Sequence, residues 1–193
     1  MEKIFFKQEE ITGMSVKERC KRGIGYIPSD RYKRAILPGF SLKDNYLLGN
    51  QYKDSYARKG MLNQEYIEKK TKELMEKFDV RAVNGDQLIG ALSGGNQQKL
   101  VLSREVDKDP DLILACQPVR GLDIGAIKFI HNVLLELRNQ GKAVLLISAE
   151  LSDLFQLSDR IGVLYKGEMM SLQETEKYTT ESISLLMAGK KGV

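Results

Sequence analysis

The spacing of apolar and polar residues predicts alternating strands and helices over the second half of the chain. Apolar runs at 111–116, 143–147 and 161–165 are bounded by turn residues. The segments between them, 124–139 and 151–157, have the spacing of amphipathic helices. Short buried strands separated by helices are typical of a parallel sheet. The sequence therefore predicts an α/β fold built on a mostly parallel sheet.

The first half of the chain has a different pattern. Residues 3–6 and 23–27 read as short strands, and Pro28 ends the second of them. Residues 64–78 read as one amphipathic helix, with its apolar positions on one side: Tyr66, Ile67, Leu74, Met75 and Phe78. We therefore expect a helical subdomain over residues 38–90. Residues 1–37 and 91–193 are expected to form an α/β lobe.

Composition places the chain among ordinary globular domains. It has 193 residues, of which 42% are hydrophobic and 29% charged. No apolar run reaches the roughly 18 residues that a membrane span needs. Cys20 and Cys116 are far apart and lack metal-site spacing, so we expect a reducing compartment and no bound metal.

Positive charge is concentrated in the first third of the chain. Residues 1–60 hold 13 Lys and Arg against 7 Asp and Glu, a net charge of +6, within a chain of net charge +4. Such an excess suits phosphates, nucleic acid or an anionic membrane surface. A solvated face is the favoured interpretation, and no nucleic-acid partner is expected.

The strongest local feature is the octet Leu92-Ser93-Gly94-Gly95-Asn96-Gln97-Gln98-Lys99, which leads into a helical pattern. Ser93 is suited to cap the helix N-terminus, and the two glycines leave room for another group to approach the backbone. A helix N-terminus presents N–H donors and a positive dipole end, which favour phosphate. A plain turn without a ligand is the alternative. The full eight-residue string, with a predicted strand beginning shortly after it at residues 109–111, argues against that alternative.

This octet resembles the signature motif of ABC-transporter ATPases, in the form typical of sugar and nucleoside importers, which fuse two nucleotide-binding domains in one chain. Three further segments carry the resemblance: 19–31 is similar to the segment that runs into the Q-loop, 109–123 to Walker B and the D-loop, and 141–167 to the switch region. The sequence of residues 115–126 is more similar to the nucleoside importers of this family than to its ribose or galactose importers. The resemblance implies the C-terminal part of a second nucleotide-binding domain, with a partial P-loop NTPase fold.

Several catalytic positions of that family are absent or altered here. The printed sequence has no G-x-x-x-x-G-K-[ST], so it carries no Walker A loop. Cys116 stands at the Walker B Asp position, where it is a poor ligand for Mg²⁺. Gln117 stands at the catalytic Glu position and cannot act as a base. Ala149 occupies the switch His position and Ser29 the Q-loop position.

The resemblance instead implies a role in trans. In ABC dimers a nucleotide lies between Walker A of one domain and the signature of the other. The expected ATP-binding residues are therefore Ser93, Gly94, Gly95, Gln97 and, from the D-loop, Asp123. For Asp123 an N-cap role is compatible with this one. ATP and Mg²⁺ are the expected cofactors of the assembled transporter, and none is expected for the isolated chain.

The expected partners are the first nucleotide-binding domain and membrane permease subunits, at the cytoplasmic face of a bacterial-type membrane. The helical subdomain and the segment Ser29–Arg34 are expected to receive the permease. We expect a fragment whose missing P-loop strand would sit beside the Walker B strand, with sheet rearrangement or self-association covering the gap.

Two other interpretations compete with this one. The first is a non-catalytic dimerisation or regulatory module of the transporter ATPase. The second is a DNA-repair or chromosome-type ATPase. That class inserts long coiled coils before the signature, and this chain shows no sustained heptads there.

Overall fold

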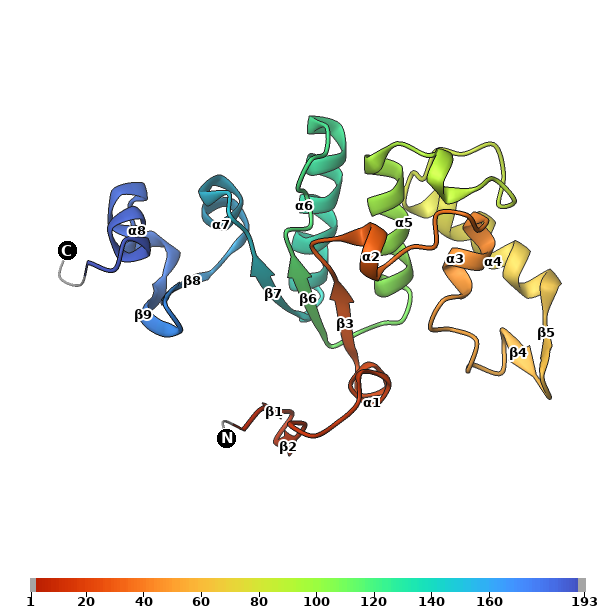
Figure 1. Ribbon diagram of the computed structural model, residues 1–193, viewed down its shortest axis with the longest axis horizontal. Helices are drawn as coiled ribbons and strands as arrows, with labels where there is room; N and C mark the ends of the chain where they lie inside the picture. The colour runs from red at the N-terminus through yellow and green to blue at the C-terminus, as the bar shows by residue number, and fades with distance from the viewer. Residues whose placement is uncertain (1–2, 191–193) are drawn as a thin grey trace. The chain divides into compact units, whose positions relative to one another are not determined.

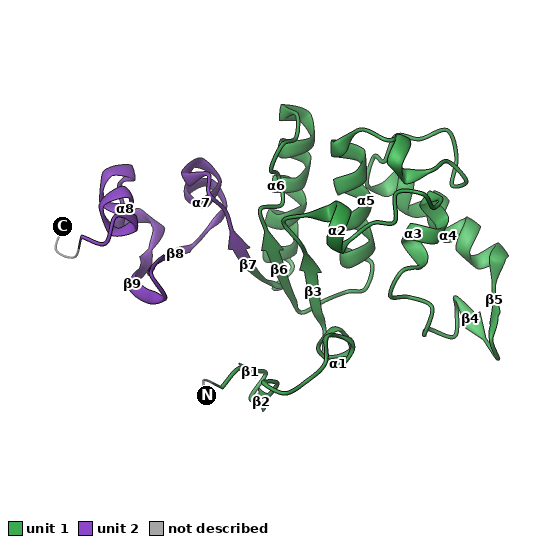
Figure 2. Ribbon diagram, viewed as in Figure 1, with its two compact units in different colours: residues 1–145 green, residues 146–193 purple. Residues whose placement is uncertain are grey.

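The computed structural model describes residues 3–190, and the chain forms two compact units, residues up to 145 and from 146 on (Figures 1 and 2). The first unit begins with the short strands β1 (Phe5–Phe6) and β2 (Glu9–Glu10), followed by α1 (Val16–Lys21) and β3 (Ile24–Ile27). Then come α2 (Arg31–Arg34), α3 (Leu42–Leu47), the hairpin β4 (Ala57–Arg58) and β5 (Met61–Leu62), and α4 (Gln64–Lys77). A short 3₁₀ turn (Ile89–Ala91) leads into α5 (Gly94–Val106), β6 (Leu112–Cys116) and α6 (Ile124–Asn139).

The second unit contains α7 (Leu151–Leu157), β8 (Arg160–Tyr165), β9 (Glu168–Glu174), a 3₁₀ turn (Thr175–Lys177) and α8 (Thr180–Met187). Strand β7 (Ala143–Ile147) begins in the first unit and ends in the second. The core of the second unit consists of Ile161, Val163, Tyr178 and Ile183. In residues 3–190 no helix has the length and apolar character needed to cross a membrane.

The α/β prediction is confirmed by the central sheet, whose strand order is β3-β6-β7. Strands β3 and β6 are parallel, with Ile24 opposite Leu112 and Ile27 opposite Ala115. The predicted helices at 124–139 and 151–157 have the observed bounds, and the helix predicted at 64–78 ends one residue earlier.

Strand β6 is the strand that resembles Walker B, and the missing P-loop strand was expected beside it. In the structure β6 is the middle strand, with β3 on one side and β7 on the other. Among the described residues both edges of β6 therefore have a neighbour, so the vacancy expected beside this strand is not found there. The sequence pattern identified the strands, but strand order depends on packing between elements far apart in the chain.

The run at 161–165 differs from the prediction of a parallel sheet. As β8, it pairs antiparallel with β9, from Arg160 opposite Glu174 to Tyr165 opposite Glu168. Lys166 and Gly167, taken as the end of the strand, both have positive φ (47° and 86°). Two such residues make a tight hairpin turn, which returns the chain beside the strand it has just left.

Helix α5 is the centre of the first unit. It packs against α3, α4, α6 and β3, and Leu100, Val101 and Leu102 are fully buried. Its buried polar residues have partners: the Ser103 hydroxyl bonds to the Tyr46 hydroxyl (3.1 Å) and Arg104 Nη1 donates to the Asn45 carbonyl (2.9 Å). Burying a polar group without a partner is costly, so these bonds fix where α5 lies and hence where it begins.

Candidate functional site: the signature turn at the start of α5

The turn formed by residues 92–97 opens α5, and Ser93 is its N-cap. Ser93 has extended backbone angles, and its hydroxyl accepts from the Asn96 backbone N–H (3.4 Å) and from Asn96 Nδ2 (3.1 Å). Ser93 is exposed, while the helix behind it is buried. The N-cap of a long helix is therefore presented at the surface of the first unit, as an anionic ligand would require.

The two glycines of the turn serve different purposes. A Cβ at Gly94 would lie 2.6 Å from Arg31 Nη2, the far end of a flexible side chain. A Cβ at Gly95 would lie 2.9 Å from the Ala126 Cβ and 3.1 Å from Asp123 Oδ2. Gly94 is half-buried, whereas Gly95 is buried beneath the start of α6. The space at Gly95 is taken by α6, so Gly95 permits helix packing, and the approach of an outside group was the wrong explanation for it.

Gln97 is not available to an outside ligand, contrary to the expectation for this residue. It is fully buried. Its Nε2 donates to the carbonyls of Ile89 (3.2 Å) and Leu92 (3.1 Å), and its Oε1 accepts from Arg31 Nε (3.1 Å). Both ends of the amide are occupied within the chain, so Gln97 supports the turn from beneath.

The structure adds two residues that the sequence interpretation missed. Asn96 bridges the turn to the preceding loop, because its Oδ1 accepts from the Arg81 N–H (2.9 Å) while Nδ2 donates to Ser93. Arg31 reaches the turn from α2, which is 66 residues away in sequence from Gln97. Asn96 lies within the signature octet itself. For Arg31 the only signal was its position two residues after Ser29.

Asp123 lies beside the turn. It is exposed and caps α6, where Oδ1 accepts from the Ala126 N–H (2.9 Å). Its other oxygen is the one that a Cβ at Gly95 would meet. The structure therefore brings Ser93, Gly94 and Asp123 together at the start of α5, with Gly95 buried against α6, and the capping role of Asp123 is observed.

The end of β6 carries Cys116 and Gln117, both half-buried. Cys116 is a free thiol at the last position of the strand. Gln117 has φ of 48°, in the left-handed region that glutamine rarely adopts. A thiol does not match the oxygen ligands that Mg²⁺ prefers, and an amide cannot take a proton from water, so this pair does not fit a hydrolytic magnesium centre.

The two remaining predicted positions belong to other segments of the chain. Ser29 is exposed between β3 and α2. Ala149 is exposed and belongs to the second unit. In residues 3–190 no group of three or more His, Cys, Asp and Glu side chains is placed to hold a metal ion.

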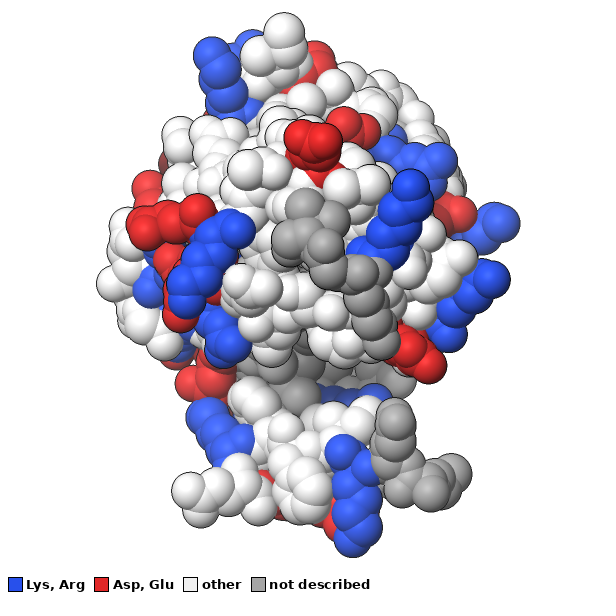
Figure 3. Space-filling model, turned by 90° about the vertical axis from the view of Figure 1, so that its left-hand side faces the viewer, with Lys and Arg blue, Asp and Glu red and all other residues white. Residues whose placement is uncertain are grey.

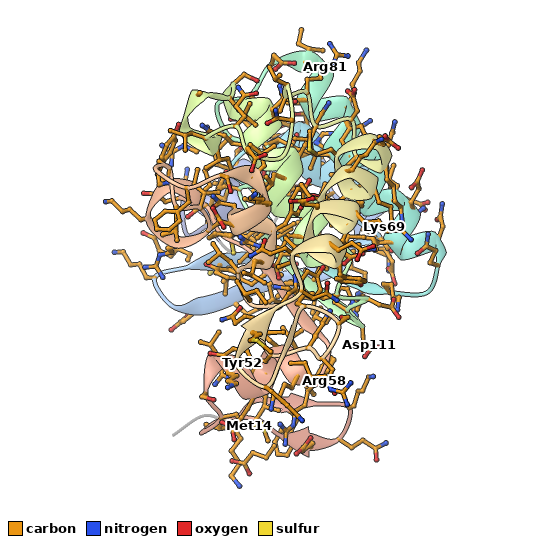
Figure 4. The ribbon with its side chains drawn as sticks, turned by 90° about the vertical axis from the view of Figure 1, so that its right-hand side faces the viewer. Met14, Tyr52, Arg58, Lys69, Arg81 and Asp111 are labelled. Atoms are coloured by element: carbon orange, nitrogen blue, oxygen red, sulfur yellow. The ribbon has the colours of Figure 1, made fainter. Side chains whose placement is uncertain are left out.

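The loop before the signature turn is fixed to α5 by charge. Lys99 Nζ bonds to Asp79 Oδ2 (2.6 Å) and to the Asp79 carbonyl (3.0 Å). The hydrogen bond from Lys99 holds the pKa of Asp79 below its usual value. Arg81, which follows in this loop, lies at the end of the first unit opposite to Tyr52 and Arg58 (Figure 4). The signature turn and the region of the β4–β5 hairpin are therefore separate surfaces.

On the face drawn in Figure 3, Lys and Arg are interspersed with Asp, Glu and uncharged residues. Some of the basic side chains in the first third of the chain form ion pairs with acidic side chains. Lys7 binds Asp111 (2.6 Å) and Arg22 binds Glu9 (2.7 Å). These pairs fit the interpretation of a solvated face.

Comparison with known proteins identifies the family. A family model described as "ABC transporter" matches residues 1–120. The chain belongs to the ABC transporter family. It is 42% identical over 181 residues to the guanosine import ATP-binding protein NupO of Bacillus subtilis (strain 168), which covers 94% of this chain and 36% of NupO. It is 38% identical to the nucleoside import ATP-binding protein NupA of Lactococcus lactis subsp. cremoris (strain MG1363), covering 94% of this chain and 36% of NupA.

Solved structures confirm the fold. The ATP-binding cassette MJ0796, in a dimeric post-hydrolysis state with ADP and phosphate, gives a TM-score of 0.73 at 22% identity, covering 91% of this chain and 74% of that one. This likeness supports a partial ABC ATPase fold. The chain spans about a third of the length of the curated relatives, since 36% of NupO and of NupA is matched.

Proposed function

We propose that this chain is part of the ATP-binding component of an ABC importer, as the C-terminal portion of its second, degenerate nucleotide-binding domain. Its task is to donate the signature turn to an ATP site whose Walker A, catalytic Glu and switch His belong to the first nucleotide-binding domain. The observation that carries this proposal is the contrast within one unit. Ser93 and Gly94 are presented at the start of a firmly buried helix, while Cys116 is a poor ligand for Mg²⁺ and Gln117 cannot act as a base to activate water.

The proposed contact set is Ser93, Gly94 and the first-turn backbone of α5, with Asp123 beside it. Gln97 is left out because its amide is buried and occupied. A nucleotide phosphate would be met by the Ser93 hydroxyl and by N–H groups at a positive helix end. In the assembled protein, bound ATP would supply this phosphate and Mg²⁺ would be its counter-ion.

Nucleosides are the proposed cargo, with simple sugars as the alternative. The support is the identity of 42% and 38% to proteins named for guanosine and nucleoside import, against 32% to a ribose import ATP-binding protein of Bacillus cereus. The proposed location is the cytoplasmic face of the membrane, where permease subunits would contact the helical part and the segment Ser29–Arg34.

The test is Ser93→Arg in the full-length protein assembled with its permease. A bulky cation at the N-cap would block the phosphate and remove the cap, so we expect ATP turnover to fall by at least tenfold, as it does when about 1.4 kcal/mol of binding is lost. Ser184→Arg, at an exposed position of α8 outside the proposed contact segments, is the matched control and should leave turnover unchanged. Unchanged turnover in Ser93→Arg would refute the role in trans.

The alternative is a non-catalytic dimerisation or regulatory module, and the packing of Gly95 under α6 favours it, since the turn also has a structural function. Calorimetric titration of MgATP separates the two. Binding only when the upstream half is present, and loss of that binding in Ser93→Arg, supports donation of the turn. Association of the halves that does not depend on nucleotide supports the module.

A further inference from the structure

Arg31 connects two segments that the chain keeps far apart. It is the first residue of α2, directly after the segment that carries Ser29, and Asp30 caps that helix by accepting from the Lys33 N–H (3.1 Å). From there its Nε donates to Gln97 Oε1 in α5 at 3.1 Å. Arg31 is half-buried, so this bond is partly shielded from water. Shielding strengthens a hydrogen bond from a charged donor.

The partner of Arg31 is itself bonded to the backbone of the signature turn. Gln97 Nε2 reaches the Ile89 carbonyl (3.2 Å) and the Leu92 carbonyl (3.1 Å), and Leu92 immediately precedes Ser93. An amide has a donor end and an acceptor end. With the guanidinium facing the oxygen, only one of the two amide orientations satisfies all three bonds. Arg31 thereby selects the orientation in which the NH₂ group holds the two carbonyls.

Arg31 also contacts the turn directly. Its Nη2 lies 2.6 Å from the position that a Cβ at Gly94 would take. The guanidinium therefore packs against the backbone at Gly94, next to the exposed Ser93. One side chain thus supports the turn in two ways, from beneath through Gln97 and from the side at Gly94.

We infer that Arg31 is a positioning residue for the signature turn. It sets the backbone at residues 92–94 through Gln97 and through its contact with Gly94, so that Ser93 and the first N–H groups of α5 face a phosphate in the correct arrangement. This inference rests on the proposed function. Helix α2 lies within the segment proposed to contact the permease, so that segment would also support the surface proposed to bind nucleotide.

The first experiment compares Arg31→Ala, Gln97→Ala and the double variant in the full-length protein assembled with its permease. Loss of a hydrogen bond from a charged group is expected to raise the ATP concentration for half-maximal turnover about tenfold in each single variant. Maximal turnover should change much less, because the groups that perform hydrolysis belong to the other domain. The double variant should lie within about twofold of the worse single variant, since both remove the same support.

Arg138→Ala is the matched control, because Arg138 is an exposed arginine in the last turn of α6, outside the segments proposed to contact nucleotide or the permease. It should behave as the unaltered protein. If the effects of Arg31→Ala and Gln97→Ala multiply in the double variant, or if Arg31→Ala has no more effect than Arg138→Ala, the inference is wrong.

A second measurement separates positioning from general stability. Amide hydrogen exchange in Arg31→Ala should speed up at residues 92–97 and stay unchanged at the buried residues 100–102 of the same helix. Equal acceleration at both places would mean that Arg31 only stabilises the fold, and would overturn the inference. Ser93→Arg keeps the two proposals apart. If Ser93→Arg leaves turnover unchanged the proposed function fails, whereas a loss in Ser93→Arg with no effect of Arg31→Ala refutes only the role of Arg31.

Discussion

The signature turn and the end of β6 lie in the same unit and differ in how tightly their side chains are held. At the turn, Gln97 is fully buried with both ends of its amide bonded, and Gly95 leaves no room for a Cβ. At the end of β6, Cys116 and Gln117 are only half-buried. The backbone of Gln117 also has positive φ, which its side chain does not favour.

The difference shows which substitutions this fold tolerates. Residues of the turn are needed both for packing and for the proposed contact with phosphate, so changing them costs stability. Cys116 and Gln117, at the end of β6, are only half-buried, so we expect substitutions there to cost less stability. Four predictions test this contrast, in order of decreasing effect.

Gly95→Val is expected to be the most damaging change. Its side chain would collide with Ala126, whose Cβ is fixed to the backbone of α6. Overpacking of this kind costs about 3 kcal/mol. Equilibrium urea unfolding measures the loss, with Gly13→Ala as control because nothing lies within 4 Å of a Cβ there. Equal stability of the two variants would contradict the packing role of Gly95.

Asp123→Ala should have an intermediate effect. It removes the cap of α6, which is worth about 1 kcal/mol. Asp123→Asn keeps a capping oxygen and should keep the stability. If the carboxylate also acts across the dimer, Asp123→Asn in the full-length protein lowers ATP turnover without lowering the unfolding midpoint. Unchanged turnover would restrict Asp123 to its capping role.

Gln117→Gly should stabilise the chain slightly. The left-handed backbone costs a non-glycine residue about 1–2 kcal/mol, and the greater freedom of glycine in the unfolded chain offsets part of that gain, leaving roughly 0.5 kcal/mol. Gln140→Gly is the matched control, since Gln140 has φ of −80° and should lose stability when changed. A loss of stability in Gln117→Gly would show that its side chain matters to the packing after all.

The Asp79–Lys99 pair should give the smallest effect, because Asp79 is half exposed. Its pKa in the folded chain is lowered by the hydrogen bond from Lys99. The stabilisation is therefore present above the ordinary carboxyl pKa of about 3.9 and is lost as the pH falls through the lower folded value. Unfolding free energy measured from pH 5 downward should fall more steeply in the unaltered chain than in Asp79→Asn. Parallel pH profiles would refute the contribution of the pair.

The sequence by itself determined the elements whose signals are local. Helix 124–139 follows from its apolar spacing and the cap at Asp123, and the helix after Ser93 follows from the capping serine and the octet. The signature octet also indicated the family, because a long and specific motif can be recognised from the sequence alone. Family membership and the α/β fold were both predictable for this reason.

Only the tertiary structure decided which residues support the signature turn. Gln97 reads as a polar residue in a ligand motif, yet burial places it beneath the turn, and Arg31 joins it across 66 residues with no periodic signal in between. The position of β6 as middle strand and the pairing of β8 with β9 likewise depend on which surfaces pack together. Such contacts arise when distant segments exclude water from a shared core. The pattern of residues close together in the sequence does not specify which distant segments will pack against one another.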